Sequence, residues 1–154
     1  MQNISFQKIG IIGIGLVGYN IASNLIKSGF ELYGVDIDIE QQRRFLHLGG
    51  QICTDPKTLV HHVNVILLAL MTPKIIDIVL FDPLTGIANS AKEELIIINC
   101  STIDPDSSLT YHSRLNDKNI KYLECPIAGG SVQIEDRTAT YLVGGDHLLF
   151  LDIS

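Results

Sequence analysis

The chain has 154 residues, of which 46% are hydrophobic and 18% are charged, and its formal net charge is −6 at pH 7. This length provides for one domain with a sizeable core and is too short for two domains of ordinary size. The apolar composition excludes a disordered tail, and the negative charge argues against a nucleic-acid-binding surface.

The chain begins with a predicted strand, a glycine-rich turn and a predicted helix. The strand is expected at Lys8–Ile12, and the helix at Leu16–Ser28, where apolar residues recur at near-3.6 spacing up to Gly29. Between them, three glycines have the spacing G-x-G-x-x-G, namely Gly13, Gly15 and Gly18. The first permits a tight turn, the second lets backbone N–H groups approach a pyrophosphate, and the third lets the helix pack close to the sheet.

An acidic residue follows the next predicted strand, Glu31–Val35. This residue, Asp36, lies 18 residues after Gly18 and can accept hydrogen bonds from the hydroxyls of an adenosine ribose. A lone glycine motif also opens helices that bind nothing or that bind S-adenosylmethionine. Here the strand, the helix and the acid all lie where a dinucleotide site requires them, so the motif predicts dinucleotide binding.

Strand-like and helical patterns continue to alternate along the chain. Further strands are expected at Gln51–Cys53 (weak), Val65–Leu70, Leu95–Asn99 and Lys121–Leu123, and further helices at Glu40–Leu48, Pro56–His62, Lys74–Leu80 and Pro105–Asn116. Two of these strands are uninterrupted apolar runs, which are typical of a parallel sheet covered on both faces. The order predicts an α/β fold with a Rossmann-like, doubly wound, mainly parallel sheet.

Ligands of such sheets lie at the carboxyl ends of the strands. By that rule the segments that share one rim with the glycine turn are Asp36, Leu70–Pro73, Cys100–Thr102 and Cys125–Gly130.

The cysteines at positions 53, 100 and 125 are widely spaced and form no C-x-x-C motif, which favours reduced thiols in a cytoplasmic protein. No base is positioned to activate Cys125, so we interpret it as a buried structural thiol.

The last segments behave differently from the alternating ones. Thr138–Val143 alternates weakly and predicts a strand, and His147–Ile153 is a short, very apolar tail. We expect a dinucleotide-binding domain over residues 1–146 and a truncated tail over 147–154. Large apolar side chains in the tail must fold back, bury against another copy or stay exposed, and we expect a homo-oligomer formed through this end. The longest apolar run, Val65–Met71, is too short to span a membrane.

Four motifs in order, between Lys8 and Asp146, resemble the β-hydroxyacid dehydrogenases, a family that includes 3-hydroxyisobutyrate dehydrogenase and the amino-terminal domain of 6-phosphogluconate dehydrogenase. The opening glycine motif is the first. NCSTIDP at 99–105 is similar to the family's S-T-x-x-P segment, LECPIAGG at 123–130 to its D-A-P-V-S-G-G signature, and TATYLVGGD at 138–146 to its strand ending in V-G-G.

The resemblance implies NAD(P)-dependent oxidation of a small 3-hydroxy acid, with hydride transfer to the nicotinamide. It implies no metal, substrate contacts from Ala128, Gly129 and Gly130, and cofactor contacts from Gly13, Gly15, Leu16, Val17, Gly18, Asp36, Ile37, Leu70, Met71, Thr72, Pro73, Ser101 and Thr102. Asp36 followed by Ile37 resembles the NAD-type members, because a carboxylate repels the 2′-phosphate of NADP.

The sequence also departs from the family pattern. The family's general acid/base is a lysine on a helix after the V-G-G strand, in front of a helical carboxy-terminal domain, and this chain stops at Ser154 before either. Ala128 replaces a serine, and Gln133, Ile134 and Arg137 stand where the family has Gly, Ala and Gly. We therefore assign no catalytic residue and expect cofactor binding without complete catalysis. The alternative is a non-catalytic NAD-binding or sensing module.

Overall fold

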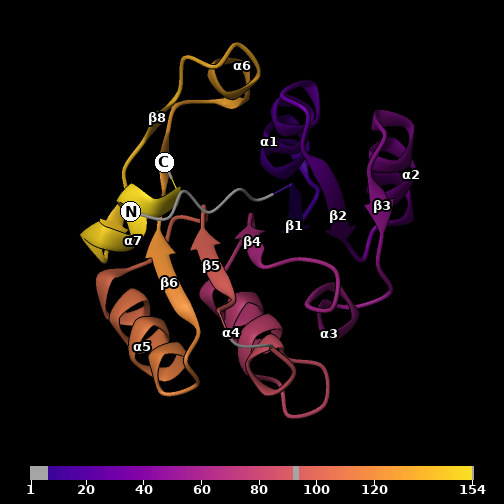
Figure 1. Cartoon of the computed structure of the whole chain (residues 1–154). Coiled ribbons are helices and arrows are strands. Elements are labelled where there is room, and N and C mark those ends of the chain that lie inside the picture. The colour runs from indigo at the N-terminus through magenta and orange to yellow at the C-terminus, as the bar shows by residue number, and fades with distance from the viewer. Residues whose placement is uncertain (1–6, 92–93, 154) are drawn as a thin grey trace.

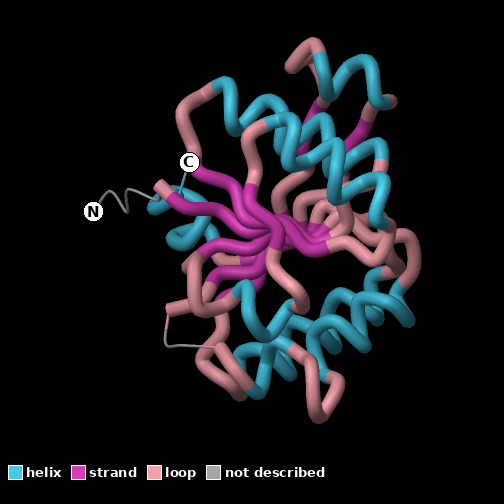
Figure 2. The backbone as a smooth tube through the Cα atoms, turned by 90° about the vertical axis from the view of Figure 1, so that its right-hand side faces the viewer, coloured by secondary structure: helices cyan, strands magenta, loops and turns pink. Residues whose placement is uncertain are grey.

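A twisted sheet with helices on both faces forms the framework of the protein (Figures 1 and 2). The computed structural model describes residues 7–91 and 94–153, so the outer bounds predicted for the domain and the tail, residues 1 and 154, lie outside the described residues. The strand order is β3-β2-β1-β4-β5-β6-β9. Its strands are β1 (Lys8–Ile12), β2 (Glu31–Val35), β3 (Gln51–Ile52), β4 (Val65–Leu68), β5 (Ile96–Asn99), β6 (Lys121–Glu124) and β9 (Gly144–Gly145).

Every neighbouring pair in this sheet is parallel except β6 and β9, which are antiparallel. The first strand lies in the middle, between β2 and β4, so the strand order reverses at β1. The helices are α1 (Leu16–Lys27), α2 (Ile39–Leu48), α3 (Pro56–Leu59), α4 (Pro73–Phe81), the short 3₁₀ helix η1 (Ile87–Asn89), α5 (Pro105–Asn116), α6 (Ser131–Glu135) and α7 (His147–Ile153). The predicted doubly wound, mainly parallel α/β fold is confirmed.

Successive side chains of the central strands point into two different core layers. On β4, Ile66 and Leu68 are fully buried in the layer that includes residues of α3, α4 and α5. Leu67 packs on the opposite face with Ile21 of α1 and Phe45 of α2. Burial on both faces explains why β4 and β5 read as continuous apolar runs rather than as alternating ones.

Some predicted segments end earlier in the structure than their apolar patterns do. The strand expected at Val65–Leu70 stops at Leu68, because the backbone turns there and Leu70 N donates to Ser101 Oγ instead of to a neighbouring strand. The helix expected at Pro56–His62 stops at Leu59, where His62 N donates to Leu59 O in a tighter turn. The strand expected at Thr138–Val143 shrinks to β8 (Thr140–Tyr141), which pairs only with β7 (Ile127–Ala128).

The apolar tail forms the helix α7 and folds back on the sheet in part. Leu149 is 5% exposed and packs against Val65, Ile96 and Leu123. Leu148 remains 71% exposed. Self-association through this end and the domain boundary at residue 146 therefore stay predictions.

Among the described residues, no helix is long and apolar enough to cross a membrane.

Candidate dinucleotide-binding site

Two of the three motif glycines are required by the packing of the turn between β1 and α1. Gly13 has φ +88°, a conformation that disfavours side chains, and a Cβ added there would lie 2.3 Å from the carbonyl oxygen of Ala69. A Cβ on Gly18 would lie 1.9 Å from the carbonyl oxygen of Gly13. These two glycines therefore let the turn close against β4 and let α1 begin directly above the sheet.

The middle glycine faces open space instead. A Cβ added at Gly15 would meet no atom within 4 Å, apart from its chain neighbours. Gly15 is also the N-cap of α1, and no side chain caps this helix. The first α-helical hydrogen bond runs from Tyr19 N to Gly15 O at 2.8 Å, so the N–H groups of residues 16–18 precede it. An uncapped helix start next to open space fits the phosphates of a dinucleotide.

The carboxylate of Asp36 is held by two backbone N–H groups at the end of β2. Ile14 N, within the glycine turn, donates to Asp36 Oδ2 at 2.6 Å, and Asp38 N donates to Asp36 Oδ1 at 2.8 Å. Each carboxylate oxygen has a further acceptor position. The side chain is therefore fixed in place while it can still accept a hydrogen bond from a ribose hydroxyl. Its neighbour Ile37 is 99% exposed.

A cleft of about 480 Å³ opens beside the glycine turn. It is lined by residues of the turn, of the loops after β4 and β5, and of the segment around α6: Gly15, Leu16, Val17, Ala69, Leu70, Met71, Cys100, Ser101, Thr102, Ile127, Gly129 and Ile134. Eight of these were predicted as site residues. Ala69, Cys100, Ile127 and Ile134 were not, although the predicted rim included Cys100 and Ile127.

The other predicted site residues lie around this cleft without lining it. Gly13 and Gly18 form the interior of the turn, and Asp36 and Ile37 follow β2. On the opposite side, Thr72 caps α4 by accepting a hydrogen bond from Ile75 N, and Pro73 is the first residue of that helix. Ala128 and Gly130 flank Gly129 on either side.

The hydroxyl of Ser101 supports a loop of the cleft. Its Oγ accepts a hydrogen bond from Leu70 N at 2.9 Å and donates to Leu68 O at 3.5 Å, and the residue is only 6% exposed. Ser101 thus fixes the point where the chain leaves β4. Thr102, the next residue, lines the cleft.

The segment that follows the predicted substrate residues, residues 131–137, is held on α1. Three of its residues, Gln133, Ile134 and Arg137, are those that depart from the family pattern. Ile134 is buried against α1 and α2 residues, and its carbonyl accepts a hydrogen bond from Asn24 Nδ2 at 2.6 Å. Arg137 donates to the backbone oxygen of Asn24 at 3.2 Å. Gln133 Oε1 accepts from Gly130 N at 2.9 Å, so the N–H group of one of the three residues expected to contact substrate already has a partner.

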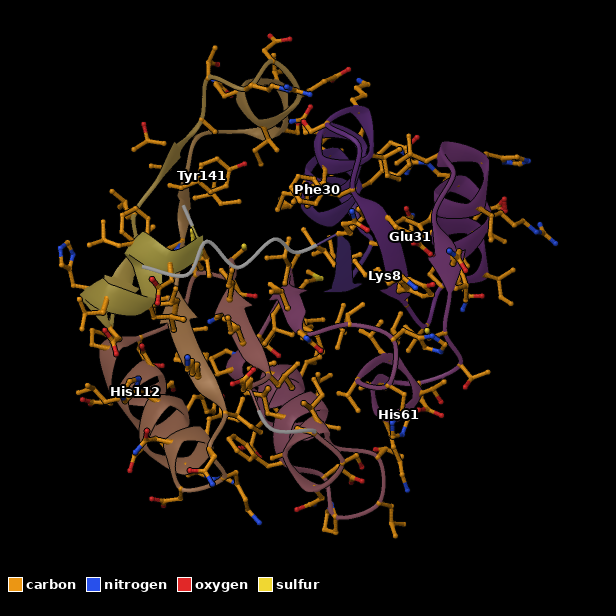
Figure 3. The ribbon with its side chains drawn as sticks, viewed as in Figure 1. Lys8, Phe30, Glu31, His61, His112 and Tyr141 are labelled. Carbon is orange, nitrogen blue, oxygen red and sulfur yellow. The ribbon has the colours of Figure 1, made fainter. Side chains whose placement is uncertain are left out.

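A second hollow, of about 550 Å³, lies at the far edge of the sheet between α5, β6 and β9. It is lined in part by Tyr122, Glu124 and His112, the last of which Figure 3 labels on α5. Burial and a short hydrogen bond to Glu124 raise the pKa of Tyr122. The hollow is larger than the cleft but contains neither the glycine turn nor the start of α1, so the cleft is the candidate dinucleotide site. In the described part of the chain, no group of three or more His, Cys, Asp or Glu residues could hold a metal ion.

Comparison with known proteins agrees with this geometry. A family model described as the NAD binding domain of 6-phosphogluconate dehydrogenase matches residues 8–153. The chain belongs to this family. Membership accounts for the order of the glycine turn, the S-T-x-x-P segment and the V-G-G strand in one NAD(P)-binding domain.

Several curated relatives of this NAD-binding domain are named as dehydrogenases. The chain is 29% identical over 143 residues to 2-(hydroxymethyl)glutarate dehydrogenase of Eubacterium barkeri, covering 93% of this chain and 47% of that protein. It is 30% identical over 139 residues to the mitochondrial 3-hydroxyisobutyrate dehydrogenase of Drosophila melanogaster, covering 90% and 42%. The chain thus spans about half the length of the curated relatives it matches.

A solved structure shows the same fold. The 3-hydroxyisobutyrate dehydrogenase of Mycobacterium tuberculosis, described with L-serine, superposes with a TM-score of 0.89 at 20% identity, over 96% of this chain and 49% of that one. At this level of identity the likeness concerns the fold of the NAD-binding domain.

Proposed function

We propose that this chain is the NAD-binding half of a dehydrogenase acting on a 3-hydroxy acid, and that it holds the dinucleotide in the cleft beside Gly15. The carrying observation is the uncapped start of α1 at a glycine whose missing side chain leaves open space. When bound, the nicotinamide supplies the acceptor for a hydride from the carbinol carbon. The dehydrogenase names of the relatives support this reaction class.

Each wall of the cleft then has a role in binding. The N–H groups at the start of α1 bind the pyrophosphate, since an anion is stabilised at a helix N-terminus. Asp36, held by Ile14 N, accepts hydrogen bonds from the adenosine ribose. The apolar side chains of Leu70 and Met71 cover one side of the dinucleotide, and the 91% exposure of Met71 leaves it accessible for that contact.

We further propose a preference for NAD over NADP, because Asp36 is a fixed negative charge where a 2′-phosphate would lie. Calorimetric titration with NADH and NADPH tests this preference. Asp36→Ala should weaken NADH binding by about 1–3 kcal/mol, the range for a hydrogen bond to a charged group. It should weaken NADPH binding less, because the same change removes the repulsion.

Two variants make this test specific. Asp36→Asn keeps an acceptor oxygen for one of the two backbone N–H groups and removes the charge, so it should narrow the NADH–NADPH difference. Asp117→Ala removes the same charge from the exposed end of α5 and should leave both affinities unchanged. Equal or tighter binding of NADPH by the unaltered chain would contradict the preference, and thermal unfolding of each variant shows whether the fold is kept.

One observation favours the alternative, an NAD-binding module without catalysis. Gln133 occupies Gly130 N, so the segment that would bind a substrate carboxylate is closed on itself. Titration of the NADH-loaded chain with 3-hydroxyisobutyrate distinguishes the two functions. Saturable binding of 3-hydroxyisobutyrate supports the dehydrogenase half. If the chain binds the dinucleotide but no hydroxy acid, the module is favoured, provided that the result is the same when the chain is joined to the helical domain of a relative.

A further inference from the structure

Two cysteines leave neighbouring strands side by side. In β5 and β6, which are parallel, Asn99 is in register with Glu124, and the next residues are Cys100 and Cys125. The hydrogen bond from Cys125 N to Asn99 O, at 2.7 Å, continues the ladder past the ends of the strands. Adjacent strands lie about 4.7–4.9 Å apart. That spacing falls within the range of about 4.4–6.8 Å between the Cα atoms of disulfide-bonded cysteines.

Both thiols point into the same core layer. Cys100 is 8% exposed and Cys125 is 9% exposed, and both pack in the cluster that also holds Ile134. The cleft opens onto this layer, because Cys100 is one of its lining residues. A small molecule in the cleft therefore has direct access to Cys100 and reaches Cys125 beside it, whereas Cys53 lies in the opposite core layer.

The surroundings of the pair differ for its two members. A hydrogen bond with Cys100 lowers the pKa of Cys125, against burial and the charge of Glu124, which raise it. The same hydrogen bond, together with burial, raises the pKa of Cys100. Burial and the charges of the two cysteines raise the pKa of Tyr141, which Figure 3 labels on β8. Of the two thiols, Cys125 is thus the one whose pKa is lowered.

We propose that Cys100 and Cys125 form a redox modification site in the wall of the cofactor cleft, where a hydroperoxide converts the two thiols into a disulfide. The Cys125 thiol loses its proton to solvent, and the thiolate attacks the terminal oxygen of the hydroperoxide. An S–O bond forms as the O–O bond breaks, which leaves a sulfenic acid, and the departing alkoxide or hydroxide takes a proton back from solvent as an alcohol or water. The Cys100 sulfur then attacks the sulfenic sulfur. The S–S bond forms as the S–O bond breaks, and the leaving hydroxide takes the Cys100 proton as water. The two sulfurs lose two electrons in total, and the peroxide gains them.

The disulfide should also affect the cleft. Cys100 precedes Ser101, whose hydroxyl holds the backbone of Leu70 at the cleft wall. This part of the inference rests on the proposed function: a dinucleotide over Cys100 shields the pair from peroxide. A disulfide at Cys100 should in turn weaken dinucleotide binding, because it displaces the loop that Ser101 supports.

The experiment treats the folded chain with hydrogen peroxide and counts thiols. Of the three free cysteines, two should be lost, leaving one titratable thiol per chain. The intact mass should fall by two hydrogen atoms, and dithiothreitol should reverse both changes. Peptide mapping of the unaltered chain should find Cys100 joined to Cys125. This mapping requires no variant, so it stands even if a substitution at either buried position prevents folding.

Three single variants are the controls. Cys53→Ser should oxidise as the unaltered chain does, whereas Cys100→Ser and Cys125→Ser should lose the intramolecular disulfide. Thermal unfolding identifies any variant that is not folded. Oxidation of Cys53 alone, or higher oxidation of single thiols without a Cys100–Cys125 link, would overturn the proposal.

Repeating the oxidation with NADH separates this site from the proposed function. With NADH at ten times its dissociation constant, the free fraction falls about elevenfold, and thiol loss should slow about tenfold. A disulfide that forms at the same rate with and without bound NADH would support the redox site and overturn our placement of the dinucleotide. If NADH slows the loss of thiols but no disulfide forms when NADH is absent, the placement of the dinucleotide is supported and the redox site is overturned.

Discussion

At the scale of single residues, the three glycines of one motif have different tasks. Gly13 and Gly18 are fixed by atoms of the chain itself, whereas Gly15 faces open space with φ −65°, which any residue can adopt. The motif predicts a ligand only through its middle glycine. The other two are equally necessary in a turn that binds nothing.

Gly15→Val should therefore abolish NADH binding and leave the fold intact, because its side chain fills the space proposed for the phosphates. Gly18→Val is the matched comparison and should lower the thermal stability strongly, since its Cβ would collide with a carbonyl oxygen. Calorimetry and thermal unfolding measure the two effects separately. NADH affinity close to that of the unaltered chain in Gly15→Val would mean that the open space at Gly15 is not the phosphate site.

At the scale of elements, helix boundaries were predictable where the sequence carries capping residues. The helix expected at Pro105–Asn116 coincides with α5, because Asp104 accepts a hydrogen bond from Ser107 N at 2.9 Å and Pro105 occupies the first turn. By contrast, β7 and α6 went unpredicted, and β8 is shorter than the strand expected at Thr138–Val143. Their positions depend on partners far away in sequence, such as Asn20 of α1, whose Nδ2 donates to Ser131 O across 111 residues. No local pattern reveals such a contact.

The same limit applies to the candidate site. The glycine turn and the loops after β4 and β5 were predictable, because parallel strands bring their carboxyl ends to one rim. Ile134 reaches the cleft only through the docking of α6 on α1, and its sequence neighbours give no sign of it. The occupied N–H of Gly130 likewise depends on a side-chain contact with Gln133.

The caps also predict how stability depends on pH. Hydrogen bonds from Thr58 lower the pKa of Asp55, and hydrogen bonds from Ser107 lower the pKa of Asp104. Both carboxylates therefore stabilise the fold at pH values above the unfolded-state pKa of about 3.9, and this contribution is lost as the pH falls through their folded-state pKa values. The effect is small, because Asp104 is exposed to solvent and Asp55 is only partly buried.

The double variant Asp55→Asn/Asp104→Asn tests this dependence, since asparagine caps helices about as well as aspartate but does not titrate. Urea unfolding at about pH 7 and at about pH 3 gives the free energy of unfolding under each condition. We expect the unaltered chain to lose more stability on acidification than the variant. An equal loss in both proteins would show that these caps do not contribute to acid sensitivity.

At the scale of the whole molecule, α7 divides into a packed side and an exposed side. Leu149→Ala should destabilise the fold by about 2–5 kcal/mol, the usual range for a buried leucine. The exposed Leu148 and Leu151 should instead mediate association between copies. We therefore expect Leu148→Ser/Leu151→Ser to sediment as a monomer with unchanged thermal stability, while the unaltered chain associates. A monomeric unaltered chain over the whole accessible concentration range would contradict this prediction.

The chain alone should show no appreciable turnover of 3-hydroxyisobutyrate. It contains no lysine after Lys121, whereas the resemblance implies a general acid/base lysine beyond the V-G-G strand. Loss of general acid–base catalysis typically reduces the rate about 10²–10⁴-fold. NADH formation by the purified chain is the measurement, with a full-length 3-hydroxyisobutyrate dehydrogenase as the positive control. Sustained turnover would point to a base within the chain, and His147 would be the first residue to replace.

The docking of α6 on α1 has a consequence for how the protein is made. The turn at Gly15 is synthesised early, but the wall of the cleft at Gly129 and Ile134 leaves the ribosome more than a hundred residues later. Contacts between such distant segments form late, since loop closure must precede them. The residues of the turn proposed to bind the phosphates are therefore synthesised long before the chain can complete the cleft. A dinucleotide will select the finished fold over partly folded intermediates and shift the folding equilibrium only at the last step.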